Sequence, residues 1–189
     1  MNTPLYLLRH TRVAIENGLC YGQLDVDVAK SFSDEVTHIQ KLLRPLSLSH
    51  VYTSPLQRCT KLAAALHLTA CKDKRLMEMD FGHWEGQSWE NIYASETGKK
   101  WFENPLTLPC PEGESFSDVI ARTSSFIHDL KEVSNMQEVS GATLLIAHGG
   151  SIRAILATLC QIPHHELFDI AIPYGHIIVI RQGQFTALC

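Results

Sequence analysis

The sequence predicts an α/β fold, a three-layer sandwich in which a mostly parallel central sheet is flanked by helices. Short, continuously apolar runs alternate with longer segments whose apolar residues recur at helical spacing. Two of the apolar runs stop abruptly at a histidine, as buried strands stop at the edge of a sheet. The 189 residues are 45% apolar and 19% charged, which is typical of a globular chain that can bury a sizeable core.

The N-terminal part of the chain alternates between strand and helix patterns. Leu5 to Leu8 is continuously apolar and predicts a buried strand. Ser33-Asp34-Glu35 then begins a helix, and Pro45 ends it. A short second strand at Val51-Tyr52 precedes another helix, for which we expect Pro55 in the first turn.

The middle of the chain is less regular. Residues 81–111 hold all three tryptophans and are expected to form short helices and loops that cover one end of the sheet. Ser115 and Asp118 predict a capping box at the start of a long helix. Thr143 to Ala147 predicts a third buried strand, and Ser151 is expected to be the N-cap of the helix behind it.

The C-terminal residues predict a closing pair of strands, Ile177 to Ile180 and Phe185 to Leu188, joined through Gln182-Gly183. The sequence contains no repeat and no low-complexity tract. We therefore expect residues 1–189 to form a single domain.

Charge and composition exclude several classes of protein. Sixteen Lys and Arg residues face 20 Asp and Glu residues, a net charge of −4, which argues against binding nucleic acid by neutralising phosphates. The longest apolar run, Leu62 to Leu66, is far below the roughly 18 residues that span a membrane. The six cysteines form no CxxC pair, and the N-terminus lacks the features of a signal peptide. Reduced thiols in a cytoplasmic protein are therefore expected.

Two histidines follow two of the predicted strands. His10 comes after the first strand and is preceded by Arg9, whereas His148 comes after the third and is followed by Gly149. Because the carboxyl ends of parallel strands meet at the same edge of a sheet, the two imidazoles should converge there. Arg58, in the first turns of the helix behind the second strand, is expected at the same end.

Two arginines and two histidines in one pocket suit a phosphoryl group. Guanidinium forks bind phosphate oxygens in a bidentate manner, and a helix N-terminus adds backbone N–H donors. A neutral imidazole can attack phosphorus to give a phosphohistidine, and fixed cations stabilise the transition state without a metal ion. For either histidine taken singly, a hydrogen-bonded structural role is the more common alternative.

Leu8-Arg9-His10-Thr11 resembles the Arg-His-Gly motif of the histidine phosphatase superfamily, which includes the cofactor-dependent phosphoglycerate mutases. Four more segments resemble the family's motifs in the expected order: Tyr52 to Cys59, Met77 to Gly86, Pro111 to Ser115, and Ala147 to Gly150. The resemblance implies an enzyme that needs neither cofactor nor metal. The roles that it implies are nucleophile for His10, phosphate binding for Arg9, Arg58 and His148, general acid and base for Glu78, and substrate binding for Tyr21, Gly22 and Gly149.

The chain departs from the family pattern at two places. Thr11 stands where the family usually has Gly, and we expect its hydroxyl to help the site or to point away. The segment 12–20 lacks the acidic-Thr-x-x-Asn pattern, so that phosphate contact stays unassigned.

Some residues near the motifs have two interpretations. Glu85 is a rival general acid, or a carboxylate that orients an arginine or a histidine, a role that Asp80 could also have. Trp84 and Trp89 either line the substrate cleft or pack in the core. His164-His165 has no third ligand at helical spacing, which favours a solvated helix start over a metal site.

A mutase and a phosphatase can share such a pocket. Residues 85–115 form a shorter segment than the corresponding one in the mutases, so the resemblance favours hydrolysis. Arg9 to Val13, Cys20 to Gln23 and Asp25 most resemble the bacterial α-ribazole phosphatases. This implies removal of the 5′-phosphate of α-ribazole phosphate during assembly of the cobalamin nucleotide loop. The alternatives are a phosphoglycerate mutase-type phosphotransferase, a broad-specificity sugar or nucleotide phosphatase, and a non-catalytic phosphate-binding module. The expected partner is a small phosphate ester, not a nucleic acid or a membrane, and an oligomer is compatible with the sequence.

Overall fold

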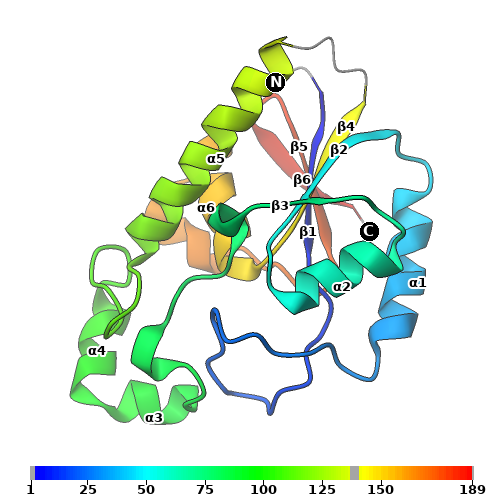
Figure 1. Cartoon of the computed structure of the whole chain (residues 1–189). Helices are drawn as coiled ribbons and strands as arrows, with labels where there is room; N and C mark the ends of the chain where they lie inside the picture. Colours follow the sequence, from blue (N-terminus) through cyan, green and yellow to red (C-terminus); the bar gives the residue numbers. More distant parts are fainter. Residues whose placement is uncertain (1–2, 137–140, 189) are drawn as a thin grey trace.

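The computed structural model describes residues 3–136 and 141–188. A six-stranded sheet forms its centre, in the order β3-β2-β4-β1-β5-β6, and Figure 1 shows helices on both of its sides. The strands are β1 Leu5–Arg9, β2 Leu48–Thr53, β3 Cys71–Lys72, β4 Ala142–Ala147, β5 Ile177–Arg181 and β6 Gln184–Leu188. The first four strands are mutually parallel where they pair, whereas β5 and β6 run antiparallel to their neighbours. The predicted architecture is confirmed, with an antiparallel hairpin at one edge.

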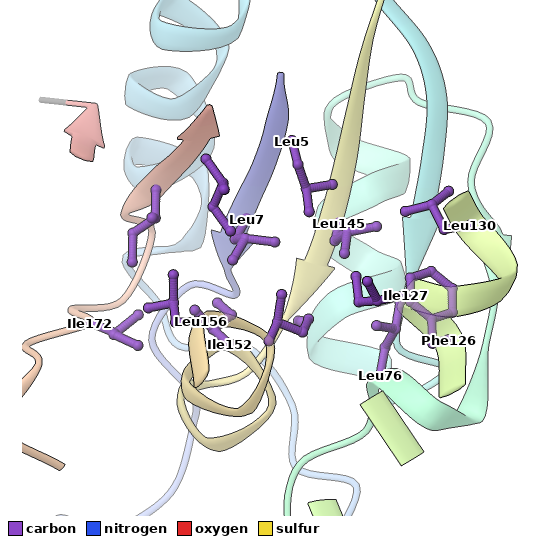
Figure 2. Packing of buried hydrophobic residues seen from close by; sticks show 14 residues of the cluster. Leu5, Leu7, Leu76, Phe126, Ile127, Leu130, Leu145, Ile152, Leu156 and Ile172 are labelled. Carbon is purple, nitrogen blue, oxygen red and sulfur yellow. The ribbon is translucent and has the colours of Figure 1, made fainter. Parts of the chain in front are cut away.

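Alternate residues of the central strands pack into two separate hydrophobic cores, one on each face of the sheet. Leu5 and Leu7 of β1 pack with helices α5 (Phe116–Met136) and α6 (Gly149–Cys160) on one face, as Figure 2 shows. Tyr6 and Leu8 pack with α1 (Phe32–Leu43) and α2 (Gln57–Ala65) on the other. Because successive side chains of a strand point to opposite faces, a strand covered on both sides must be apolar throughout. This explains why β1 and β4 stand out in the sequence.

Strand β2 is longer than the predicted Val51-Tyr52. It also includes Ser49 and His50, whose polar side chains hide the strand pattern, yet its backbone pairs with β4 from Leu48 onward. Pairing with a central strand here outweighs the weak strand preference of the sequence.

Two predicted helix starts are wrong. Leu56 has an extended backbone, with φ −62° and ψ 140°, so α2 begins at Gln57 and Pro55 lies just outside its first turn. Helix α6 begins at Gly149 with His148 as the N-cap, and Ser151 is the third helical residue, whose hydroxyl accepts a hydrogen bond from the His148 backbone N–H at 3.1 Å. Both glycines therefore belong to the helix and do not form a loop before it.

The capping box before α5 is confirmed. The Asp118 carboxylate accepts hydrogen bonds from the backbone N–H and the hydroxyl of Ser115, at 2.8 and 2.6 Å. The Ser115 hydroxyl in turn accepts from the Asp118 N–H at 3.3 Å. These bonds satisfy donors that the first turn of a helix leaves free.

Residues 81–111 form short helices and loops, as expected, and pack on the loop that follows β1. The elements are the 3₁₀ helix η2 (Gly82–Trp84), α3 (Trp89–Ala94) and α4 (Glu96–Glu103). Backbone hydrogen bonds of 2.8 Å join Cys20 to Gln87 and Trp89 to Gly18. This layer therefore covers the carboxyl end of β1. Two further 3₁₀ helices, η1 (Lys74–Leu76) and η3 (His164–Asp169), complete the fold. Within the two described ranges, no helix has both the length and the apolarity needed to cross a bilayer.

Candidate active site

The carboxyl ends of β1, β4 and β2 bring the predicted phosphate-binding side chains together. Arg9 pairs with Ala147 in the register of β1 and β4, so the next residues, His10 and His148, lie side by side with ring centroids 5.0 Å apart. Arg58, in the first turn of α2, donates from Nε to Nδ1 of His148 at 3.2 Å. The side chains that the strand-end argument places at one edge of the sheet therefore do lie together.

The hydrogen bonds of His10 define its tautomer. Its Nδ1 lies 2.7 Å from the backbone oxygen of Thr11, which can only accept, so the proton is assigned to Nδ1. The other ring nitrogen, Nε2, then carries a free lone pair. Burial lowers the pKa of His10 well below its ordinary value, and the charges of Arg58 and Arg9 lower it further. A neutral imidazole with a free Nε2 has the form that a nucleophile requires.

His148 adopts the opposite tautomer. Its Nδ1 accepts from Arg58, and its Nε2 lies 2.8 Å from the hydroxyl of Ser54, to which we assign it as donor. Burial, followed by the charge of Arg58, lowers the pKa of His148 well below its ordinary value. The thiol of Cys59 contacts the same Nε2 at 3.5 Å, and burial raises the pKa of that thiol to about 12. Cys59 is therefore a protonated neighbour of the ring.

Backbone carbonyl groups hold the Arg58 guanidinium. Nη1 donates to the oxygen of Leu24 at 2.9 Å and Nη2 to the oxygen of Gly22 at 2.6 Å, and the whole side chain is buried. Gly22 has no room for a side chain, because a Cβ there would lie 2.5 Å from the backbone oxygen of Met79. The fork of Arg58 is thus fixed before any anion binds.

Arg9 is held in a similar way but retains a free donor. Its Nη1 donates to the backbone oxygen of Ile172 at 2.6 Å, and its Cζ lies 3.9 Å from the ring centroid of Tyr174. Its Nε is buried and has no hydrogen-bond partner among the described residues. Because buried donors are nearly always satisfied, this one marks a place for an acceptor such as a phosphoryl oxygen.

Tyr174 is a site residue that sequence reasoning missed. Its hydroxyl is 2.6 Å from that of Tyr21, its ring centroid is 5.5 Å from that of His10, and it lines the cavity described below. Burial, followed by the hydrogen bond with Tyr174, raises the pKa of Tyr21. The backbone N–H of Gly175 contacts the carbonyl oxygens of both Arg9 and His10. Only the pairing of β5 with β1 brings this loop to the site.

The two candidate acids differ in position. Glu78 lines the cavity, and its carboxylate accepts from the backbone N–H groups of Met79 at 2.9 Å and Gly150 at 3.1 Å. A Cβ on Gly150 would collide with Oε1 of Glu78 and lie 3.2 Å from its Cδ. Glu78 therefore contacts the first turn of α6, in space that is free because Gly150 has no side chain.

Glu85 binds backbone and is absent from the described cavity lining. Its Oε1 accepts from the N–H of Gln23 at 2.7 Å, and its Oε2 accepts from the N–H of Leu24. It thereby fixes the loop whose carbonyl groups hold Arg58. This geometry favours the interpretation of Glu85 as a carboxylate that orients an arginine. The Asp80 carboxylate accepts from the N–H of Gly82 at 2.8 Å and so stabilises a local turn.

A cavity of about 460 Å³ opens beside Arg9, Tyr174 and Glu78. The buried side chains of His10, Arg58 and His148 are not among its described lining residues. The predicted substrate-binding residues Tyr21 and Gly22 also line it, whereas Gly149 lies behind Arg9: a Cβ there would be 3.6 Å from the Arg9 Cζ. The remaining lining residues are Arg12, Val13, Ile15, Glu16, Asn17, Gly18, Leu19, Ala29, Phe81 and Trp89.

The structure also places the remaining side chains that have two interpretations in the sequence. Trp89 lines the cavity, and Trp84 is buried in the core between the short helices and α5. Thr11 is fully buried, and its hydroxyl has no hydrogen-bond partner within the described part of the chain. His164-His165 lies exposed at the start of η3. Across residues 3–136 and 141–188, no three His, Cys, Asp or Glu side chains gather as a metal-binding group.

Arg153 is a second residue that the sequence analysis overlooked. Its Nε and Nη2 donate to the backbone oxygens of Leu167 and Ile170, at 3.0 and 2.9 Å. A Cβ on Gly149 would lie 3.1 Å from its Nη1. Arg153 thus ties α6 to the segment that leads to Ile172.

Comparisons with known proteins identify the family of the chain. A model of the histidine phosphatase superfamily (branch 1) matches residues 5–187. A Hydrogenobacter thermophilus protein provisionally named phosphoserine phosphatase 2 is 31% identical over 192 residues, which covers 97% of this chain and 92% of that protein. The glucosyl-3-phosphoglycerate phosphatase of Mycobacterium tuberculosis is 30% identical over 172 residues, which covers 84% and 76%.

Among solved structures, the α-ribazole phosphatase of Shigella flexneri superposes with a TM-score of 0.85 at 22% identity, covering 98% of this chain and 94% of that one. This likeness establishes the shared fold. The family match over almost its whole length shows that the chain belongs to the histidine phosphatase superfamily, branch 1.

Proposed function

We propose that this chain is a metal-independent phosphomonoester hydrolase that works through a phosphohistidine at His10. One observation carries the proposal: a buried, neutral His10 lies in a cluster with two arginines, and neither its Nε2 nor the Nε of Arg9 has a hydrogen-bond partner among the residues that the structure describes. A neutral nucleophile beside fixed, unneutralised positive charge suits attack on an anionic phosphate ester.

In the first step, Nε2 of His10 forms a bond to phosphorus while the bond from phosphorus to the ester oxygen breaks. Arg9 and Arg58 hold the equatorial oxygens, whose charge grows in the transition state, and His148 joins them when its Nε2–H turns from the Ser54 hydroxyl to a phosphoryl oxygen. Glu78 in its acid form gives a proton to the departing alkoxide. The position of Glu78 on the cavity wall supports this role.

In the second step, water attacks the phosphohistidine and gives a proton to the Glu78 carboxylate. The bond between nitrogen and phosphorus breaks, phosphate leaves, and His10 returns to its neutral form. Each residue ends the cycle as it began, so the scheme needs no further reactant.

The finer proposal is that the natural substrate is α-ribazole 5′-phosphate. The motifs around Arg9 and Tyr21 support it, as does the shared fold with the Shigella flexneri enzyme. The curated relatives carry names that describe other phosphate esters, so a substrate panel must include phosphoserine and glucosyl-3-phosphoglycerate. A cytoplasmic location is part of the same proposal, supported by five free cysteines at positions 20, 59, 71, 110 and 160.

The test combines a panel of esters, assayed in chelator, with trapping of the intermediate. We expect hydrolysis in chelator, and an alkali-stable, acid-labile label on the enzyme after an alkaline quench. His10→Ala should lose both turnover and label. A wild-type enzyme that makes product and is never labelled would refute the phosphohistidine. Phosphate transfer to an added alcohol or phosphoglycerate, in place of release to water, would support a phosphotransferase instead.

A further inference from the structure

The cavity has two chemically unlike parts. Arg9, Glu78 and the two tyrosines lie at the phosphate-binding end. The loop 13–19 and the segment 81–89 contribute mostly apolar side chains: Val13, Ile15, Leu19, Phe81 and Trp89. An apolar wall beside a cationic pocket is suited to a substrate whose leaving group is itself apolar over part of its surface.

Trp89 is the largest side chain of this wall, and its position is fixed from several directions. Its backbone N–H donates to Gly18 across the cavity edge, and Phe81 packs edge-on against its ring with centroids 5.1 Å apart. Trp101 lies nearly parallel to it at 6.5 Å. Trp84 and Trp101 are only 5% and 6% exposed, whereas Trp89 is partly exposed and lines the cavity. A rigid indole that reaches a cavity is preorganised for stacking.

The charges on this side argue against an acidic leaving group. Of the described lining residues outside the phosphate-binding end, Arg12 and Glu16 carry charge. Arg12 is already paired with Glu35 at 3.4 Å, and its side chain is 64% exposed. A substrate carboxylate would therefore meet one exposed cation that already faces a carboxylate, and would be repelled by Glu16.

We propose that Leu19, Phe81 and Trp89 form a subsite for a planar, uncharged aromatic ring in the leaving group, and that Trp89 determines specificity by stacking on it. The ligand class is a phosphate monoester whose leaving group carries such a ring, which includes the proposed α-ribazole 5′-phosphate and other base-bearing ribose phosphates. The inference rests on the proposed hydrolase function, and it extends that function by naming the side chains that choose the substrate.

A matched pair of esters isolates this contribution. Ribose 5-phosphate and a 5′-nucleotide share the same leaving oxygen on the same sugar carbon, so they differ in the base and not in the chemistry. Base stacking on an aromatic side chain should favour the base-bearing ester by about 10- to 100-fold in kcat/KM. The gain should be mainly in KM, because the base is distant from the reacting bond.

Two substitutions then test Trp89. Trp89→Phe keeps an aromatic ring and should retain most of the preference, whereas Trp89→Leu keeps apolar bulk and should lose most of it. Tyr93→Ala is the control: Tyr93 is on the same helix, is 63% exposed and is absent from the cavity lining. Its ratio of the two kcat/KM values should match that of the wild type.

Equal kcat/KM for the two esters in the wild type, or an unchanged ratio in Trp89→Leu, would overturn the subsite while leaving the hydrolase intact. Failure of the wild type to hydrolyse any ester of the panel would overturn the hydrolase, and the subsite with it.

Discussion

Gly150→Ala should separate catalysis from stability. The new Cβ would overlap Oε1 of Glu78 and lie 3.2 Å from its Cδ, so the carboxylate must move by about an ångström or more. The obstructed atoms are the end of a flexible side chain, which can rotate away. Replacing Gly by Ala within a helix contributes about 0.5–1 kcal/mol of stability, and the displaced carboxylate loses a hydrogen bond to Gly150 worth about 1 kcal/mol. The two effects nearly cancel, so the melting temperature should change little.

The effect on catalysis should be large. General acid catalysis contributes about 10²- to 10⁴-fold, and a displacement of about 1 Å can cost about 100-fold. We therefore expect kcat for an alkyl phosphate to fall by about 100-fold in Gly150→Ala. With p-nitrophenyl phosphate, whose leaving group needs little protonation, the loss should be only a few-fold. The assay is steady-state kinetics on both esters, together with thermal unfolding.

Glu78→Gln supplies the control. If the alanine acts by displacing Glu78, then Gly150→Ala should cause little further loss in a Glu78→Gln background. An equal loss in both backgrounds would show that the methyl group acts by another route. Full alkyl phosphatase activity in Gly150→Ala would refute the assignment of Glu78 as the acid.

Three more predictions concern the side chains around the proposed phosphate-binding site. Arg58→Lys should weaken inhibition by vanadate by at least about tenfold, because an ammonium has three donors and would have none left for the anion after bonding the three acceptors that now hold Arg58; an unchanged inhibition constant would place Arg58 outside the anion site. Glu85→Gln should reduce activity on alkyl and aryl phosphates by the same factor, because Glu85 holds a loop and not the transferred proton; a loss confined to alkyl esters would make Glu85 the acid. The protein without bound phosphate should lose stability as the pH falls below about 6.5, because the pKa values of His10 and His148 are lower in the folded than in the unfolded state. Between the folded-state and unfolded-state pKa values, the unfolded chain binds more protons than the folded chain. The stability that the two neutral histidines contribute is therefore fully present above pH 6.5 and is lost on acidification. The melting temperature, measured from pH 8 to pH 5, should fall less steeply with acidification in His10→Asn than in the wild type. An identical pH dependence would contradict the assignment of this effect to His10.

Much of the site could be predicted because its chemistry lies at the ends of apolar strands. Leu5 to Leu8 and Thr143 to Ala147 are unbroken runs, so the strand-end rule is enough to place His10 and His148 at one edge of the sheet. The helix starts were harder to predict. Ser151 has the residue type of an N-cap, but the glycine pair before it enters the helix. Local preference alone could not distinguish the two arrangements.

What the sequence could not predict depends on contacts between distant segments. Glu78 and Glu85 are seven residues apart and chemically alike, and only the fold shows that one faces the cavity while the other binds backbone. Tyr174 has no motif around it, and it reaches Arg9 because β5 pairs antiparallel with β1. A sequence motif identifies residues whose role depends on their near neighbours in the chain. The roles of Glu78, Glu85 and Tyr174 depend instead on contacts between segments that are distant in the sequence.

The tethering of Arg9 and Arg58 by main-chain oxygens has an evolutionary consequence. A carbonyl group is present whatever the side chain, so the exposed Leu24 can change without removing the group that aims the Arg58 fork, whereas Ile172, whose oxygen aims Arg9, is also held by core packing. Mutation can therefore remodel the rim of the pocket while the reacting centre stays in register. A scaffold of this kind can acquire new substrates by drift in its loops, with no interval in which the underlying chemistry is lost.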